Sequence, residues 1–147
     1  LQVEHTVTEA VTGIDLVALQ LALAEGATLA SLGLEPGAVP PRRGAAIQAR
    51  VCMERMEKDG VPRPCGGTLA VYEPPSGPGV RVDGFGYAGY RTSPAFDSLL
   101  AKVIVRTDAE DFGALVASLR RALREFRIEG VETNFAFLDS LLSREEV

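Results

Sequence analysis

Residues 33–44 divide the sequence into two parts of different character. This segment reads GLEPGAVPPRRG and carries three prolines and three glycines. The adjacent prolines near its end lack backbone donors and have fixed backbone angles, so neither a helix nor a central strand can pass through them. We therefore expect a module boundary near Arg42, with one part over residues 1–38 and a second part over residues 42–147.

The part before the boundary shows helical patterns. Thr6 and Glu9 have the spacing of a capping box, which predicts a short helix directly after them. Gly13 is expected to interrupt this helix, and Asp15 to cap a second one, LVALQLALAE, which the following glycine would end. The second helix is apolar on most sides, so we expect it to be buried in something larger.

The part after the boundary begins with strand patterns. Apolar and polar residues alternate over residues 46–54, which predicts a strand. Shorter strands are expected over residues 68–73 and 80–83, on either side of the turn-forming PPSGPG. Consecutive β-branched residues in AKVIVRT, residues 101–107, indicate a buried strand.

Two helices are expected after these strands, which makes the second part α+β. The first would be capped by Thr107 or Asp108 and has one apolar stripe at helical spacing. This stripe consists of Phe112, Leu115, Val116, Leu119, Leu123 and Phe126. Thr133 can cap the last helix. The expected buried side of that helix consists of Phe137, Leu138, Leu141 and Leu142.

Charge and composition exclude several classes of protein. The formal net charge of -5 at pH 7 argues against a surface built mainly for nucleic acid or an anionic membrane. No apolar run approaches the roughly 18 residues of a membrane-spanning helix, and no signal peptide is visible. Cys52, Cys65 and the single histidine cannot furnish a four-ligand zinc site. We expect a reduced, cytoplasmic setting.

One glycine motif is misleading. Residues 84–89, GFGYAG, have the G-x-G-x-x-G spacing of dinucleotide-binding turns. Such a turn must open directly into a helix, with an acidic residue about 20 positions further on. Here YRTSP follows instead. We interpret the motif as a flexible loop.

The first five residues contain a candidate site. If they are extended, Gln2 and Glu4 share one face and His5 lies on the other. An amide beside a carboxylate can form a binding site, but an exposed strand edge also carries polar residues, and the residues alone leave both interpretations open. We interpret His5, on the apolar side, as a packed and hydrogen-bonded histidine rather than a ligand.

Other polar residues present the same choice. Arg50 lies mid-strand, where its guanidinium needs a carboxylate, an anion or water, and Glu54 on the same face is one candidate partner. Asp97 and Ser98 suit a helix cap as well as a site. Lys102 could reach solvent from a strand end, and we interpret it as structural.

Four stretches, in order, resemble the biotin carboxylase family. LQVEHTVTEAVTGIDL is similar to the family's Gln-Val-Glu-His-x-Val-Thr-Glu and Thr-Gly-x-Asp-Leu, which close its ATP-grasp domain. RRGAAIQARV is similar to Arg-Gly-His-Ala-Ile-x-x-Arg, GYRTSPAFDSLLAK to a Tyr-Asp-Ser-x-x-x-Lys run, and GVETN to Gly-x-x-Thr-Asn. Ala45 and Phe96 depart from the family's histidine and tyrosine, and CMERMEKDGVPRPCGG departs from its usual wording.

The resemblance implies a fold and a reaction. Residues 1–38 would be the C-terminal end of an ATP-grasp domain. Residues 42–147 would be the biotin carboxylase C-terminal domain, an α+β fold with a mostly antiparallel sheet and packed helices. The chain would be a fragment of an ATP-dependent ligase that carboxylates carrier-bound biotin with bicarbonate, and we expect the isolated fragment to be inactive.

The resemblance also assigns roles to residues. It implies that Glu4 is the general base that deprotonates bicarbonate, while Gln2 and the backbone amide of Val3 bind that anion. Arg50 would bind bicarbonate too and would stabilise the enolate of biotin. Arg81 and Asp97 match positions of a possible homodimer interface. For Arg81, a solvent-facing position on an edge strand stays open as the alternative.

Cofactors and partners follow from the same resemblance. The intact enzyme would use ATP, Mg2+ and biotin, although the fragment would hold no metal site and no bound cofactor. Its partners would be a biotin carboxyl carrier protein or domain, a carboxyltransferase and a second copy of itself. The acceptor, an acyl-CoA or pyruvate, stays open. A non-catalytic dimerisation or binding module is the alternative, and a carbamoyl-phosphate-type ligase is disfavoured by Gln-Val-Glu-His.

Overall fold

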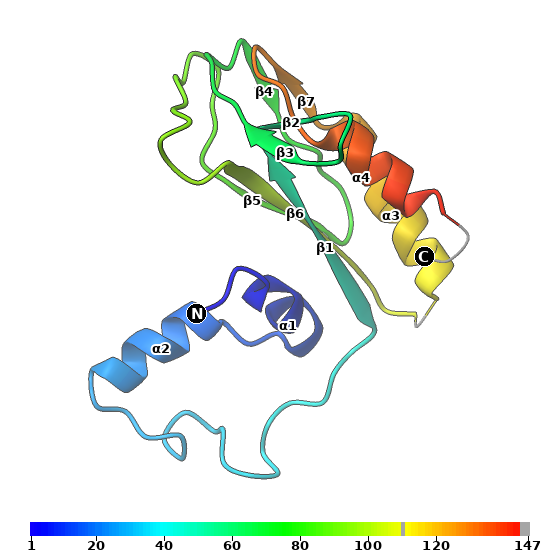
Figure 1. Cartoon of the computed structure of the whole chain (residues 1–147). Coiled ribbons are helices and arrows are strands. Elements are labelled where there is room, and N and C mark those ends of the chain that lie inside the picture. The colour runs from blue at the N-terminus through cyan, green and yellow to red at the C-terminus, as the bar shows by residue number, and fades with distance from the viewer. Residues whose placement is uncertain (110, 145–147) are drawn as a thin grey trace.

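The computed structural model describes residues 1–109 and 111–144 (Figure 1). Its helices are α1 (His5–Thr12), α2 (Leu16–Ala24), α3 (Phe112–Glu125) and α4 (Phe135–Leu142). Its strands are β1 (Ala45–Cys52), β2 (Glu54–Met56), β3 (Pro62–Pro64), β4 (Val71–Glu73), β5 (Val80–Gly84), β6 (Leu99–Thr107) and β7 (Arg127–Glu129). Residues 33–44 form neither helix nor strand, as their prolines and glycines predict.

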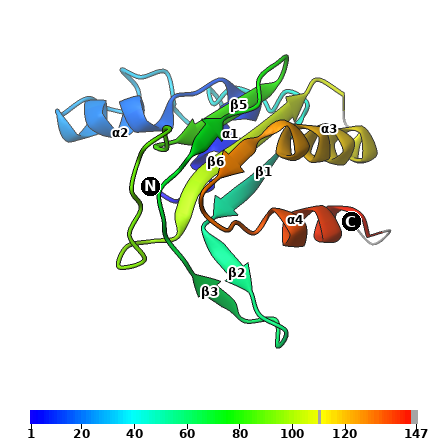
Figure 2. The ribbon, with the colours of Figure 1, turned by 90° about the horizontal axis from the view of Figure 1, so that it is seen from above.

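The main sheet has three antiparallel strands in the order β1-β6-β5. Two small antiparallel pairs, β2 with β3 and β4 with β7, complete the strands of the described residues. The β2–β3 hairpin projects from the body of the molecule (Figure 2). The α+β fold with a mostly antiparallel sheet is therefore confirmed.

The core lies on one face of the main sheet. Helix α3 packs against β1 and β6 and is joined there by α4, whereas α1 lies against the opposite face of the same two strands (Figure 1). The buried residues of this core are Ala49, Val51, Ala101, Val103, Val105, Leu115, Leu119, Ala122, Leu123, Phe126 and Leu142. Since side chains alternate along a strand, Lys102, between Ala101 and Val103 of this core, faces α1 instead. Leu100 of the same strand packs with Met53 and Leu69 in a second, smaller cluster.

Several helix boundaries differ from the sequence-based expectation. Helix α1 begins at His5, two residues earlier than a Thr6 cap would place it. The expected capping box does not form, because the Thr6 hydroxyl bonds to Gln48 and the Glu9 carboxylate accepts from the Leu16 N–H. The cap of α3 is Asp111, whose Oδ1 accepts from the Ala114 N–H at 3.0 Å.

The last helix also differs from its expected pattern. Helix α4 begins after Asn134 rather than after a Thr133 cap, because the Asn134 side chain bonds to the backbone of β1. Phe137 and Leu141, expected on the buried side, are exposed. Phe112, expected in the apolar stripe of α3, is exposed as well.

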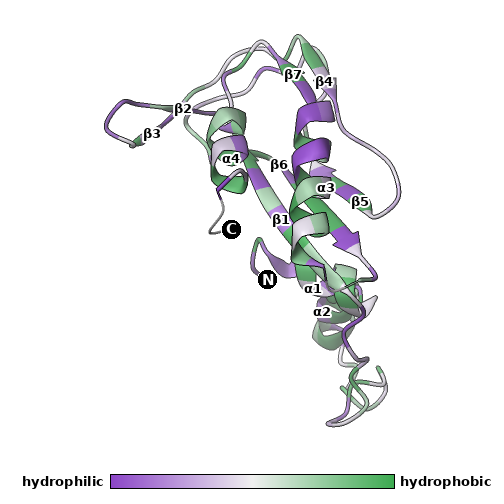
Figure 3. Cartoon of the chain, turned by 90° about the vertical axis from the view of Figure 1, so that its right-hand side faces the viewer, coloured by the Kyte–Doolittle hydropathy of each residue, from purple (hydrophilic) through white to green (hydrophobic). Residues whose placement is uncertain are grey.

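Helix α2 behaves as expected at its ends. Asp15 Oδ1 accepts from the Ala18 N–H at 2.8 Å, and Gly13 terminates α1 with a left-handed backbone, φ 73°. The helix is hydrophobic along its length (Figure 3) and buries no residue against the described part of the chain. The expectation that α2 is buried in a larger structure stays a prediction.

No single helix among the described residues is long and apolar enough to cross a membrane. Helices α1 and α2 taken together have the length and apolar composition of a membrane-spanning segment, but they are bent by 103° at the break between them.

The G-x-G-x-x-G stretch starts at the last residue of β5 and continues as a loop, as interpreted from the sequence, and it does not open into a helix. Two of its three glycines, Gly84 and Gly86, pack against Tyr72. A Cβ at Gly84 would lie 2.2 Å from the Tyr72 hydroxyl oxygen, and a Cβ at Gly86 would lie 2.5 Å from the ring. Any side chain at either position would therefore displace the tyrosine.

Truncating a core residue of α3 should destabilise the chain. Leu119 is 1% exposed, so Leu119→Ala removes buried methyl groups and leaves a cavity. We expect a loss of about 2–5 kcal/mol in the free energy of unfolding, measured by denaturant titration. Phe112→Ala on the same helix is the matched control and should cost less than about 1 kcal/mol. Equal losses for both variants would contradict the placement of this core.

Candidate functional site

The face of the sheet that is turned toward α1 carries a row of charged side chains. In the antiparallel register, Arg50 of β1 and Asp83 of β5 are both opposite Lys102 of β6. Residues in direct cross-strand register share a face and lie close enough to interact. The strands therefore place two cations and one carboxylate in a line beneath the start of α1.

Glu4 and Arg50 meet at the first position of this row. Arg50 Nη2 lies 3.0 Å from Glu4 Oε2, and the two side chains are 51% and 56% exposed. The two residues are 46 positions apart in the sequence. Glu54, the candidate partner of Arg50 considered from the sequence, accepts instead from the Ser98 hydroxyl. An ion pair this exposed adds little stability, so a small anion can compete for Arg50 at low cost.

The first residues form a turn rather than an extended strand. The His5 N–H donates to the Gln2 carbonyl oxygen at 3.2 Å, and His5 Nδ1 lies 2.7 Å from the same oxygen. Because a carbonyl oxygen only accepts, Nδ1 carries a proton in this contact. The alternation expected for Gln2 and Glu4 therefore does not apply. His5 is hydrogen-bonded, as expected, but within its own turn.

Lys102 lies in the middle of β6 and not at a strand end as expected. Its side chain is 11% exposed, and Nζ is 3.3 Å from Asp83 Oδ2. The same ammonium group donates to the backbone carbonyl oxygen of Val3 at 3.3 Å. A buried ammonium needs such partners, because burial without them would disfavour its charge.

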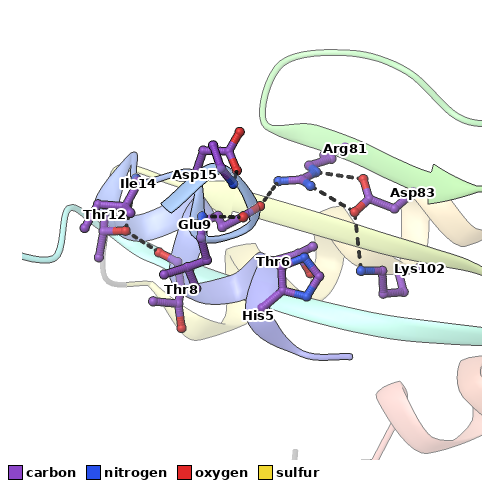
Figure 4. Close-up of polar contacts among 12 residues, drawn as sticks. His5, Thr6, Thr8, Glu9, Thr12, Ile14, Asp15, Arg81, Asp83 and Lys102 are labelled. Carbon is purple, nitrogen blue, oxygen red and sulfur yellow. Dashed lines mark hydrogen bonds and ion pairs between the residues drawn. The ribbon is translucent and has the colours of Figure 1, made fainter. Parts of the chain in front are cut away.

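Arg81, on the edge strand β5, binds two carboxylates of its own chain (Figure 4). Its Nε and Nη2 donate to Asp83 at 2.7 and 2.9 Å, and its Nη1 donates to Glu9 Oε2 at 2.7 Å. The Glu9 side chain is only 8% exposed and also accepts from the Leu16 N–H. Arg81 is thus not a free solvent-facing arginine. Its place at a dimer interface stays a prediction.

The charges of this network act on Asp83. Partial burial raises the pKa of the Asp83 carboxyl, but the hydrogen bonds and positive charges of Arg81 and Lys102 outweigh burial and lower that pKa below its ordinary value. The hydrogen bond to Asp83 is the largest of the effects that raise the pKa of Arg81. Asp83 and Arg81 are therefore charged near neutral pH.

Asp97 lies apart from this network in the described contacts. Its Oδ1 accepts from the Leu99 N–H at 2.8 Å at the start of β6, so it ends a loop and caps no helix. The neighbouring Phe96 is among the exposed aromatic residues. An interface role for Asp97 stays a prediction.

The described residues contain no group of three or more His, Cys, Asp or Glu side chains that could hold a metal ion. Cys52 and Cys65 are free thiols, and burial raises the pKa of both.

Sequence reasoning missed Glu9, Asp83 and Lys102 as members of one network. The visible signal was a lysine inside an apolar, β-branched run, where a charge has to find a partner. The partner could not be named because the register of β5 against β6 is not readable from the sequence.

Two protein families match the chain. The biotin carboxylase C-terminal domain matches residues 48–147, and the carbamoyl-phosphate synthase L chain ATP binding domain matches residues 1–32. Pyruvate carboxylase of Aspergillus niger is 46% identical over 144 residues, which cover 97% of this chain and 12% of that protein. Biotin carboxylase 1 of Bacillus subtilis (strain 168) is 43% identical over 145 residues, which cover 99% of this chain and 30% of that protein.

Solved structures agree with these relatives. A single-chain, multi-domain long-chain acyl-CoA carboxylase superposes with a TM-score of 0.93 at 47% identity, covering 99% of this chain and 16% of that one. The biotin carboxylase domain of the Hydrogenobacter thermophilus 2-oxoglutarate carboxylase, solved with MgADP, ADP and bicarbonate, gives a TM-score of 0.87 at 33% identity, covering 99% of this chain and 30% of that one. The biotin carboxylase C-terminal domain matches more than half of this chain, and the two relatives are 46% and 43% identical to nearly all of it. The chain therefore belongs to the biotin carboxylase family.

Proposed function

We propose that this chain belongs to the biotin carboxylase component of a biotin-dependent carboxylase, which carboxylates carrier-bound biotin with ATP and bicarbonate. The observation that carries the proposal is the contact of Glu4 with Arg50, two residues far apart in the sequence. The chain spans 12% of the fungal pyruvate carboxylase and 30% of the bacterial biotin carboxylase, so the reaction is proposed for the complete protein.

The paired side chains have the right chemistry for bicarbonate. The planar guanidinium of Arg50 presents parallel donors to an oxyanion, and the Glu4 carboxylate beside it can accept the proton of the bound bicarbonate. Loss of that proton leaves a more negative and more nucleophilic anion, which the positive charge of Arg50 stabilises. The Gln2 amide and the Val3 N–H lie in the same turn and are proposed as further donors to this anion.

The described residues do not fit a magnesium ion, because they form no cluster of metal ligands. We therefore derive no step through the metal or the nucleotide from this chain. We propose that ATP, Mg2+ and biotin bind to the complete protein. The 2-oxoglutarate carboxylase domain that was solved with MgADP and bicarbonate supports this proposal by likeness.

The domain division is proposed as residues 1–38 for the end of the ATP-grasp domain and residues 42–147 for the C-terminal domain. The two family matches, which leave residues 33–47 between them, support this division. A carrier, a carboxyltransferase and a second copy are the proposed partners, with Arg81 and Asp97 at the interface between copies. The two free cysteines support a cytoplasmic setting.

Removing the proposed base should abolish turnover in the complete protein. Glu4→Gln keeps the size of the side chain but removes the group that accepts the proton. We expect bicarbonate-dependent ATP cleavage, measured with free biotin, to fall by about 100-fold or more. Glu35→Gln, at an exposed site in the segment of residues 33–44, is the matched control and should leave the rate unchanged. Undiminished carboxylation by Glu4→Gln would favour the alternative, a non-catalytic dimerisation or binding module.

Replacing the proposed anion-binding residue should weaken the response to bicarbonate. Arg50→Lys keeps the positive charge but loses the paired, planar donors, so kcat/KM for bicarbonate should fall about tenfold or more. The KM for ATP should change little, because no nucleotide contact is assigned to Arg50. Arg63→Lys on the exposed strand β3 serves as the control. If Arg50→Lys matched this control in steady-state kinetics, Arg50 would not bind the anion.

A further inference from the structure

We propose that Lys102 is a positioning residue of the bicarbonate site: by bridging Asp83 and the Val3 carbonyl oxygen, it fixes the turn that carries Glu4. This inference rests on the function proposed above and deepens it. Lys102 is given no contact with the reacting anion. Its effect passes through the backbone of the turn.

The position of Lys102 in the fold favours such a role over a packing role. Val103 and Val105, on the other face of β6, belong to the core beneath α3. Lys102 points away from that core, toward the face against which α1 lies. Its ammonium group is largely buried, and it contacts the Asp83 carboxylate and the Val3 backbone carbonyl. A charge at this depth is costly unless both partners stay in place.

The carbonyl that Lys102 binds is next to the proposed base. The oxygen of Val3 belongs to the peptide unit that joins Val3 to Glu4, and a peptide unit is planar. Fixing this oxygen therefore fixes the plane from which the Glu4 backbone starts. The side chain of Glu4 is held at its other end by Arg50, the cross-strand neighbour of Lys102. Adjacent positions on β1 and β6 thus hold both ends of the base.

The other contacts of the turn cannot replace this tether. Both contacts of His5 with Gln2 are internal to the turn and do not attach it to the sheet. The hydroxyl of Thr6 bonds to Gln48 and attaches the first residues of α1, but not the turn before them. Among the described contacts, Lys102 is the group that ties the backbone of the turn to β6.

Lys102 is itself held in place by an ion-pair network. Its partner Asp83 receives two hydrogen bonds from Arg81, and Arg81 also binds Glu9 in the last half of α1 (Figure 4). The network therefore anchors α1 at two points. Arg81 binds Glu9 in the second half of the helix, and Lys102 binds the Val3 carbonyl oxygen just before the helix starts. This arrangement holds α1 and the turn before it as one unit on the sheet.

The test compares the two lysines of this chain in the complete protein. Lys102→Met keeps the aliphatic length of the side chain and removes the ammonium group, while Lys58→Met makes the same change at an exposed turn position. We expect Lys102→Met to lower kcat/KM for bicarbonate at least about tenfold, with a raised KM for bicarbonate, because misplacing a reactive group by about an ångström is costly. The KM for ATP should stay within about twofold of the unmodified value.

A purely structural role predicts a different pattern. It would lower the melting temperature and the amount of active enzyme but leave the KM values for bicarbonate and ATP unchanged, and that result would overturn the proposal. Lys102→Arg restores a donor and should recover part of the bicarbonate KM. If Lys102→Met does not fold, the variant Asp83→Asn, which removes the carboxylate partner of Lys102, is measured in its place. A raised KM for bicarbonate in this variant supports the positioning role, and an unchanged KM overturns it.

Measuring Glu4→Gln alongside separates the two proposals. If Glu4→Gln loses turnover and Lys102→Met behaves like Lys58→Met, the positioning role of Lys102 is wrong while the proposed function stands. If Glu4→Gln keeps full turnover, the proposed function of this site is wrong and the role of Lys102 falls with it.

Discussion

The structure depends on a buried lysine at the centre of its main sheet. Strand β6 is apolar on the face that meets α3, but on the other face Lys102 places a positive charge at a nearly solvent-free position. A charge there must be paired, and the pairing brings together β5, through Asp83, and the turn before α1, through Val3. Polar contacts through Lys102, Gln48 and Arg81 thus attach the N-terminal part of the chain to the sheet, while the opposite face holds the main core.

The contact of Glu4 with Arg50 has the opposite character. It lies at the end of the same charged row but is open to solvent, where an ion pair contributes little to folding. A rigid buried network beneath an exchangeable exposed pair is a suitable arrangement for a site that binds and releases a small anion. The rigid part would set the geometry, and the exposed part would exchange partners. The anion that we propose for this site is bicarbonate.

Local patterns predicted the elements that local forces determine. The expected strands over residues 46–54, 80–83 and 101–107 correspond to β1, β5 and β6 of the main sheet, and Asp15 capped α2 as expected. Where a tertiary partner competes for a side chain, the local pattern failed. Thr6 bonds to Gln48 instead of capping α1, and Asn134 bonds to β1, so α4 lacks a side-chain cap.

The candidate site was predicted only in part, for the same reason. Glu4 and Arg50 could be named through the family resemblance, but the residues alone offered only Glu54 as a candidate partner of Arg50 and left the choice open. The true partner depends on how α1 lies across the sheet. The short strands β2 and β3 were missed because they have three residues each and β3 contains two prolines, a composition that indicates a loop.

The central claim is that Glu4 and Arg50 form the bicarbonate site, and a crystal structure of the complete protein with bicarbonate tests it most directly. The account predicts an anion with its oxygens about 3 Å from the Arg50 guanidinium and its proton directed at the Glu4 carboxylate. Bicarbonate bound elsewhere, with the Glu4 to Arg50 contact still closed, would contradict the account.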